Sequence, residues 1–220
     1  MPIKPSNRFV AFIDILGVSQ LLADEGSSSK FTSILYDLLF TVLKKEGFHE
    51  LQNIHDSRIV EFELTRPYDK RVRLTALSDA IVLSIPESSN GKKKHRNSRL
   101  VQILSIVETI SNLQSSLASI GVLSRGGLSY GPILHTRDIV VGSGLVKAHE
   151  LESKLAIWPR TLVDKMVIEM LLRDEIPSDI MGFRSRIAHA ISVDTDGEYF
   201  VDYFGFRPLF GGILRQQENF

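Results

Sequence analysis

Cysteine is absent from this chain of 220 residues. Without thiols, the protein can form neither disulfide bonds nor zinc and iron sites held by thiolates. A surplus of basic residues is also missing, because 26 Lys and Arg are balanced by 26 Asp and Glu. A dedicated nucleic-acid-binding protein needs such a surplus for its phosphate contacts, so that class of function is disfavoured.

Long apolar runs are missing too, and none in the sequence is long enough to span a bilayer. The N-terminal residues M-P-I-K-P-S-N-R lack the apolar core of a signal peptide. We therefore expect a cytoplasmic protein without membrane contact. Hydrophobic residues at 43% and charged residues at 24% fit an ordinary globular protein. At this length we predict one domain over residues 1–220, with a mobile basic loop at 86–98 and a C-terminal tail at 206–220.

The stretch F-V-A-F-I-D-I-L-G, residues 9–17, contains an unbroken apolar run that ends at Asp14. Such a run predicts a strand buried on both faces. A carboxylate at the tip of a buried strand is costly to desolvate unless a cation or a hydrogen-bond donor is its partner. Asp14 is therefore a candidate binding residue, and a capping role at the strand end is the structural alternative.

Periodicity along the chain predicts helices interspersed with hairpins. Helices are expected at 18–23, 30–45, 99–120, 145–155 and 164–172. Strands are expected at 57–65, 71–77, 80–85, 123–135, 138–144, 160–163, 187–193 and 198–204. This order predicts an α+β fold of the ferredoxin-like or palm type, with a mostly antiparallel sheet covered by helices.

A second carboxylate, Asp79, lies in a predicted tight hairpin between the strands at 71–77 and 80–85. In a palm-like sheet this hairpin lies beside the first strand, so Asp14 and Asp79 are expected to face one point. Two carboxylates with a backbone carbonyl and a triphosphate suit Mg²⁺, which prefers few protein carboxylates and substrate phosphates. The N–H groups that open the next helical turn are candidates for holding phosphates, and they belong to Ile15, Leu16, Gly17 and Val18.

Other patterns favour a structural interpretation. The six histidines show no metal-ligand spacing, and Gly142-Ser143-Gly144 lacks the third glycine of a dinucleotide-binding loop. The basic run from Lys92 to Arg96 is interpreted as a solvated loop rather than a phosphate-binding patch. Tyr130, on a glycine-flanked strand, is a candidate for contacting a base, and packing is the alternative.

Several segments resemble, in order, the motifs of class III nucleotidyl cyclases. F-I-D-I-L-G resembles their F-x-D-I-x-G-F start, and L-T-A-L-S-D-A-I-V-L-S resembles the K-x-x-G-D hairpin that carries the second metal-binding Asp. R-G-G-L-S-Y-G-P-I resembles the R-x-G-I-x-x-G-x-V strand. V-V-G-S-G-L-V-K-A-H-E-L-E-S resembles W-G-N-x-V-N-x-A-S-R-M-E-S. Together these segments span residues 9–153, most of the chain.

This resemblance implies cyclisation of a nucleoside triphosphate, in which the 3′-hydroxyl attacks the α-phosphate and pyrophosphate leaves. It implies two Mg²⁺ or Mn²⁺ ions per active site, held by Asp14, Asp79 and the backbone carbonyl of Ile15. It also implies a head-to-tail homodimer with active sites at the interface.

The chain departs from the family pattern where the base is read. Thr75 stands at the position of the adenine-reading Lys, and Asp138 lies one residue before the position of its partner Asp. The variant motifs, with A-I-W-P-R-T-L-V-D and D-G-E-Y-F-V-D-Y, are similar to the stand-alone pyrimidine cyclases of bacterial anti-phage systems. We therefore predict UTP or CTP as substrate in anti-phage defence, and a purine cyclase is the alternative.

The chain also departs from the family where the transition state is stabilised. Val146 and Glu150 stand in place of the family's Asn and Arg. The candidate catalytic cations are therefore Arg125 and Lys147, with Arg160 as a further candidate for phosphate charge. These losses leave a second class of function open, a catalytically silent nucleotide-binding module on the same fold.

Overall fold

The computed structural model describes residues 4–23, 29, 32–33, 72–77, 79–87, 99–136, 138–174 and 183–205. The predicted helix at 30–45, apart from residues 32 and 33, lies outside this part of the chain, as do the predicted strand at 57–65 and the tail at 206–220. Within the described residues, no helix has the length and apolar character needed to cross a membrane.

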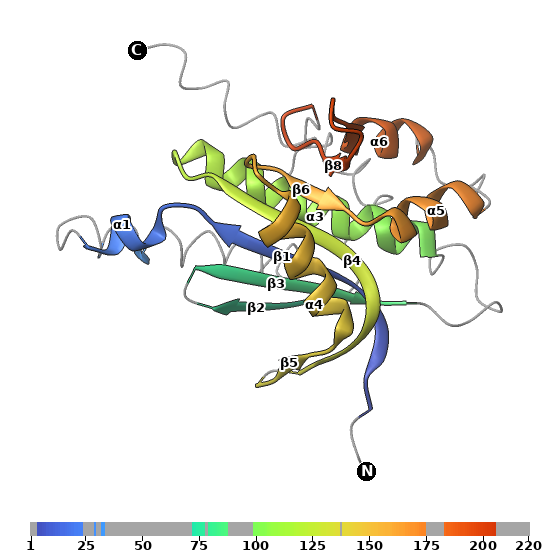
Figure 1. Cartoon of the computed structure of the whole chain (residues 1–220), viewed down its shortest axis with the longest axis horizontal. Coiled ribbons are helices and arrows are strands. Elements are labelled where there is room, and N and C mark those ends of the chain that lie inside the picture. The colour runs from blue at the N-terminus through green and yellow to red at the C-terminus, as the bar shows by residue number, and fades with distance from the viewer. Residues whose placement is uncertain are drawn as a thin grey trace, which may run out of the picture.

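A mostly antiparallel sheet organises the fold, with strand order β2-β3-β1-β4-β6-β8-β7 and with β5 paired to β4 off this path (Figure 1). The strands are β1 (Ser6–Ile15), β2 (Arg73–Leu77), β3 (Ala80–Pro86), β4 (Ser124–His135), β5 (Val140–Val141), β6 (Thr161–Val163), β7 (Ile191–Val193) and β8 (Tyr199–Val201). β4 and β6 pair in parallel, whereas the other described pairs are antiparallel. The predicted palm-type α+β fold is confirmed.

The central position of β1 explains its apolar sequence. β1 pairs with β3 on one side and with β4 on the other. Phe9, Val10, Ala11 and Ile13 are completely buried, as the continuous apolar run predicts. The strand therefore carries Asp14 on a rigid element in the middle of the sheet.

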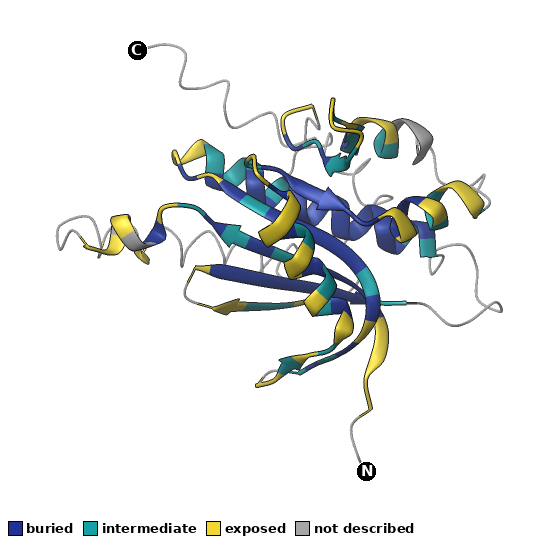
Figure 2. Ribbon diagram, viewed as in Figure 1, coloured by how far each residue is buried: buried dark blue, intermediate teal, exposed yellow. Residues whose placement is uncertain are grey.

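Different helices cover the two faces of the sheet (Figures 1 and 2). The helices are α1 (Val18–Ala23), α3 (Arg99–Ser119), α4 (Ser143–Glu150), its π-helical continuation η5 (Leu151–Leu155), α5 (Lys165–Arg173) and α6 (Phe183–Ala190). α3 packs with Phe9, Ala11 and Ile13 in the main core. Val10 and Phe12, whose side chains alternate to the other face, pack with Leu145 of α4. Asp14 continues this second series, so the alternation assigns its side chain to the face covered by α4.

Small residues on β4 allow α4 to approach the sheet closely. A Cβ at Gly127 would lie 2.2 Å from the carbonyl oxygen of Ala148 and 2.6 Å from Cβ of Leu151. A Cβ at Gly131 would lie 3.2 Å from Cα of Gly144. Between these glycines, the hydroxyl of Ser129 donates to the carbonyl oxygen of Gly144 at 2.6 Å. The close approach of the helix backbone to β4 is therefore the physical reason for glycine at position 127.

One predicted strand is partly a helix. Residues 187–190 were expected to extend the strand at 187–193, but they form the last turn of α6, and β7 begins at Ile191. The partner strand explains the difference, because β8 ends at Val201, which pairs with Ile191. The preceding residues have no partner strand in the described sheet, and Ala190 instead accepts a hydrogen bond from the amide of Asp202 at 3.0 Å.

Candidate active site

The β2–β3 hairpin places Asp79 beside the end of β1. Asp14 pairs with Ala80 in the antiparallel ladder, and the amide of Ile15 donates to the carbonyl oxygen of Asp79 at 2.7 Å. Asp79 is exposed, and the side chain of Asp14 is 24% exposed. Two carboxylic acids, distant in sequence, are thus carried by neighbouring backbone positions at one end of the β1 and β3 strands, and both are at least partly exposed to solvent.

Arg125 lies directly across from Asp14 on β4, in the position where antiparallel neighbours share a face. Its Nε donates to Oδ2 of Asp14 at 3.3 Å. The same Nε lies 2.7 Å from Oε1 of Glu152, a residue that is only 3% exposed. Arg125, which the sequence proposes as a catalytic cation, is therefore placed between two carboxylates.

Glu152 was not recognised from the sequence, although a signal for it exists. Gly144, Ala148 and Glu152 follow one another at spacings of four residues, and all three are buried. The small residues allow this helix face to lie on β4, and Glu152 occurs where the helix becomes the π-helical turn η5. Such turns are frequent at functional sites. Burial raises the pKa of Glu152, and the positive charge of Arg125 opposes this rise.

The acidic pair fits Mg²⁺ or Mn²⁺ as an incomplete site. Carboxylate oxygens are suitable ligands for both ions, and Mg²⁺ is commonly held by one or two carboxylates together with substrate phosphates. Among the described residues, no group of three or more acidic, His or Cys side chains forms a metal cage. Asp14 and Asp79 therefore match an ion that arrives with a phosphate-bearing substrate better than a permanently bound structural ion.

Two of the amides predicted to bind phosphate, among Ile15 to Val18, already have backbone partners. Ile15 donates its amide to Asp79, and Leu16 donates its amide to the carbonyl oxygen of Leu123 at 2.9 Å. Gly17 has a positive φ of 78°, the left-handed conformation in which a side chain is disfavoured, and this turn leads into α1. Of these four residues, only Gly17 and Val18 make no amide hydrogen bond to another backbone group within the described part of the chain.

Lys147, the other predicted catalytic cation, pairs with Asp164 instead of Asp14. Its Nζ lies 2.7 Å from Oδ2 of Asp164. The other carboxylate oxygen of Asp164 accepts a hydrogen bond from the amide of Met166 and caps the N-terminus of α5. This pair links α4 to α5, so the structure does not bring Lys147 into contact with Asp14.

Tyr130 lies further along β4, where it pairs with Phe9 rather than with the end of β1. Its ring packs against Phe9 with a centroid distance of 5.1 Å, and its hydroxyl donates to the carboxylate of Glu87. Burial, reinforced by Glu87, raises the pKa of Tyr130 to about 12. These contacts place Tyr130 away from the two aspartates.

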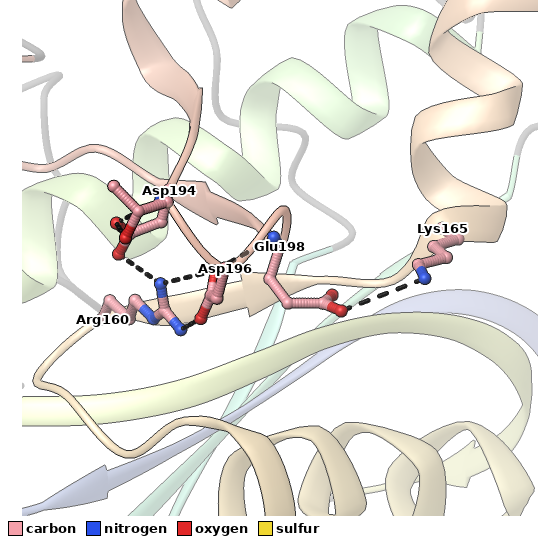
Figure 3. A network of polar contacts seen from close by, with 6 residues as sticks. Arg160, Lys165, Asp194, Asp196 and Glu198 are labelled. Atoms are coloured by element: carbon pink, nitrogen blue, oxygen red, sulfur yellow. Dashed lines mark hydrogen bonds and ion pairs between the residues drawn. The ribbon is translucent and has the colours of Figure 1, made fainter.

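Arg160 is held in the polar network drawn in Figure 3. Its guanidinium donates to Asp194 and Asp196, which belong to the turn between β7 and β8. The side chain is 6% exposed. Arg160 therefore anchors this hairpin to the start of β6, and these contacts account for its charge.

A buried polar network lies at the β2–β3 edge of the sheet. His135 is 5% exposed, with Nδ1 at 2.7 Å from the hydroxyl of Ser84 and Nε2 at 3.0 Å from the hydroxyl of Thr75. Burial and the charges of Arg8 and Arg73 lower the pKa of His135 to about 4. Thr75, the position that resembles the base-reading Lys, is thus hydrogen-bonded to a neutral imidazole.

Comparison with known proteins identifies the fold. No protein-family model and no curated protein matches the sequence. The structure is similar to the catalytic core of a rhodopsin-guanylyl cyclase with converted specificity in complex with ATPalphaS, with a TM-score of 0.51 and 14% identity over 91% of this chain and 97% of that chain. It is also similar to a bacterial light-regulated adenylyl cyclase, with a TM-score of 0.50 and 11% identity over 91% of this chain and 54% of that chain. At these identities the likeness shows that the chain has the fold of a nucleotidyl cyclase catalytic domain.

Proposed function

We propose that the protein is a nucleotidyl cyclase that converts a nucleoside triphosphate into a 3′,5′-cyclic nucleotide and pyrophosphate. The observation that carries this proposal is the placement of Asp79 beside the end of β1, next to Asp14, by the Ile15–Asp79 backbone bond. The same fold in a guanylyl and an adenylyl cyclase supports it. The ordered resemblance of residues 9–153 to cyclase motifs supports it independently of the structure.

In this reaction the substrate's 3′-hydroxyl loses its proton to solvent and attacks the α-phosphorus, and the bond between that phosphorus and the pyrophosphate oxygen breaks. Asp14, Asp79 and the carbonyl of Ile15 would hold two Mg²⁺ or Mn²⁺ ions, which lower the pKa of the hydroxyl and neutralise charge on the leaving group. The amides of Gly17 and Val18, which make no backbone hydrogen bond within the described residues, are candidates for binding phosphate oxygens. Arg125 lies next to Asp14 and is the best-placed candidate among the predicted cations for offsetting developing charge.

For the substrate base we propose UTP or CTP, in a role in anti-phage defence. Support comes from Thr75, which stands where an adenine-reading Lys is expected and whose hydroxyl is bonded to His135 at 3.0 Å. A hydroxyl that is already bonded to a buried imidazole cannot make the contacts of an ammonium group, which carries three donors. A purine cyclase is the alternative within the same chemistry, and the product formed distinguishes the two.

The decisive measurement is incubation of the purified protein with Mn²⁺ and each of the four nucleoside triphosphates, with products identified by mass spectrometry. We expect a cyclic pyrimidine nucleotide and pyrophosphate. Asp14→Asn should reduce turnover at least about a hundredfold, because loss of a metal ligand removes several kcal/mol of transition-state stabilisation. Glu169→Gln, which removes an exposed carboxylate on α5, is the matched control and should keep full activity. Full activity in Asp14→Asn would refute the proposed site.

A catalytically silent nucleotide-binding module is the second candidate function. Its support is that Val146, which replaces a transition-state residue of the family, is 59% exposed and apolar, while Glu150 is paired with Lys154 at 2.8 Å. Neither side chain supplies a donor to a phosphate. Nucleotide binding without Mn²⁺-dependent pyrophosphate release would favour this module over the cyclase.

A further inference from the structure

A buried carboxylate shares one N–H group with the proposed metal ligand. Arg125 Nε is 3.3 Å from Asp14 Oδ2 and 2.7 Å from Glu152 Oε1. The bond to Asp14 is aligned as a hydrogen bond, whereas Glu152 Oε1 makes no aligned hydrogen bond within the described residues. A single N–H proton cannot serve both oxygens fully, so the two carboxylates compete for this N–H group of Arg125.

The stability of the fold alone does not explain why the carboxylate of Glu152 is buried. A charged side chain that is 3% exposed loses most of its hydration, and an apolar residue of similar volume is often as stable or more stable in such a position. The close approach of η5 to β4, which requires glycine at position 127, is what holds the carboxylate there. An exposed ion pair between Arg125 and Asp14 would not need this arrangement.

The balance of charge around Asp14 gives a functional reason for the buried carboxylate of Glu152. A guanidinium paired only with Asp14 would neutralise the carboxylate and repel a divalent cation bound to it, because charges this close interact strongly near a partly buried site. Glu152 gives Arg125 a second, closer anion and so leaves the charge of Asp14 available. With ionised side chains, Asp14, Asp79, Glu152 and Arg125 together carry a net charge of −2, whereas without Glu152 they carry −1.

We propose that Glu152 is a positioning residue that neutralises Arg125, so that Asp14 remains an effective ligand for a divalent cation. The inference rests on the proposed function, since it concerns the same metal site. It adds a residue that does not touch the substrate and acts through Arg125. It also assigns a role to η5, the π-helical turn that carries Glu152.

Titration of the nucleotide-free protein with Mn²⁺, followed by water-proton relaxation, tests the proposal without measuring activity. Glu152→Gln should weaken Mn²⁺ binding about 10- to 100-fold, the usual effect of removing a group that supports a metal ligand. The double variant Arg125→Gln with Glu152→Gln should restore the affinity to within a few-fold of wild type, because it removes the repelling cation as well. A purely structural role of Glu152 would not produce this rescue.

Glu150→Gln is the matched control, since it removes a charge two residues away on an exposed side chain and should change Mn²⁺ affinity less than about twofold. Thermal melts establish that each variant is folded, and the double variant tests the charge argument even if Glu152→Gln unfolds. Wild-type Mn²⁺ affinity in folded Glu152→Gln would overturn the role of Glu152 but not the proposed metal site. A double variant that binds Mn²⁺ at least tenfold more weakly than wild type would do the same. Wild-type binding that is unchanged in Asp14→Asn, or no Mn²⁺ binding either to the nucleotide-free protein or with a 3′-deoxynucleoside triphosphate that cannot cyclise, would overturn the proposed metal site and this inference together.

Discussion

At the residue scale, His135 makes the free energy of unfolding depend on pH. Its ring nitrogens contact Ser84 and Thr75, and its pKa of about 4 lies below the ordinary value of 6.5. The folded state therefore favours the neutral ring. The contribution of neutral His135 to the free energy of unfolding is fully present above pH 6.5 and is lost as the pH falls towards 4. We expect His135 to account for about 2–3 kcal/mol of the stability lost between pH 7.5 and 4.5.

Urea unfolding at the two pH values checks this expectation. His135→Gln should be less stable than wild type at pH 7.5, because its neighbours lose hydrogen bonds, but it should lose about 2–3 kcal/mol less between the two pH values. His189→Gln, at an exposed position in α6, is the control and should follow wild type. An unchanged acid dependence in His135→Gln would show that other groups cause the loss.

At the scale of elements, the contact of α4 with β4 depends on two glycines of unequal importance. A Cβ at Gly127 would lie 2.2 Å from a backbone oxygen, whereas a Cβ at Gly131 would have its closest contact at 3.2 Å. Gly127→Ala should therefore destabilise the fold by about 3 kcal/mol and Gly131→Ala by about 1 kcal/mol, as measured by urea unfolding. If the two variants are equally stable, α4 adjusts to the sheet more easily than this packing implies.

The same elements show how far a sequence determines the site. The apolar run before Asp14 and the hairpin at Asp79 are local patterns, and each predicted the element that the structure contains. Glu152 was missed because its burial depends on tertiary packing, namely the approach of η5 to Gly127. Arg125 was found only through resemblance, since its position opposite Asp14 follows from a strand register between residues far apart in the chain. Residues 187–190 form a helix rather than a strand because β8 ends at Val201.

At the scale of the whole molecule, the homodimer implied by the sequence resemblance predicts that activity depends on protein concentration. Exposed apolar side chains occur along the segment around α4, and they are Ile139, Val141, Val146, Leu155, Ile157 and Trp158. Apolar groups exposed in this way favour burial against a second surface. If active sites form between two copies of the chain, dilution should lower the specific activity, and analytical ultracentrifugation should detect dimers at the concentrations where turnover is high.

Val146→Glu is the sharpest test of this assembly, because Val146 is apolar and 59% exposed on α4. A charge buried in the interface without a partner should weaken dimerisation at least about tenfold and lower activity in parallel. Leu172→Glu is the matched control, since Leu172 on α5 is 80% exposed and lies outside the segment around α4. A protein that is monomeric and fully active at all concentrations would exclude interfacial active sites. The fold would then have to supply every group that holds the triphosphate from a single chain.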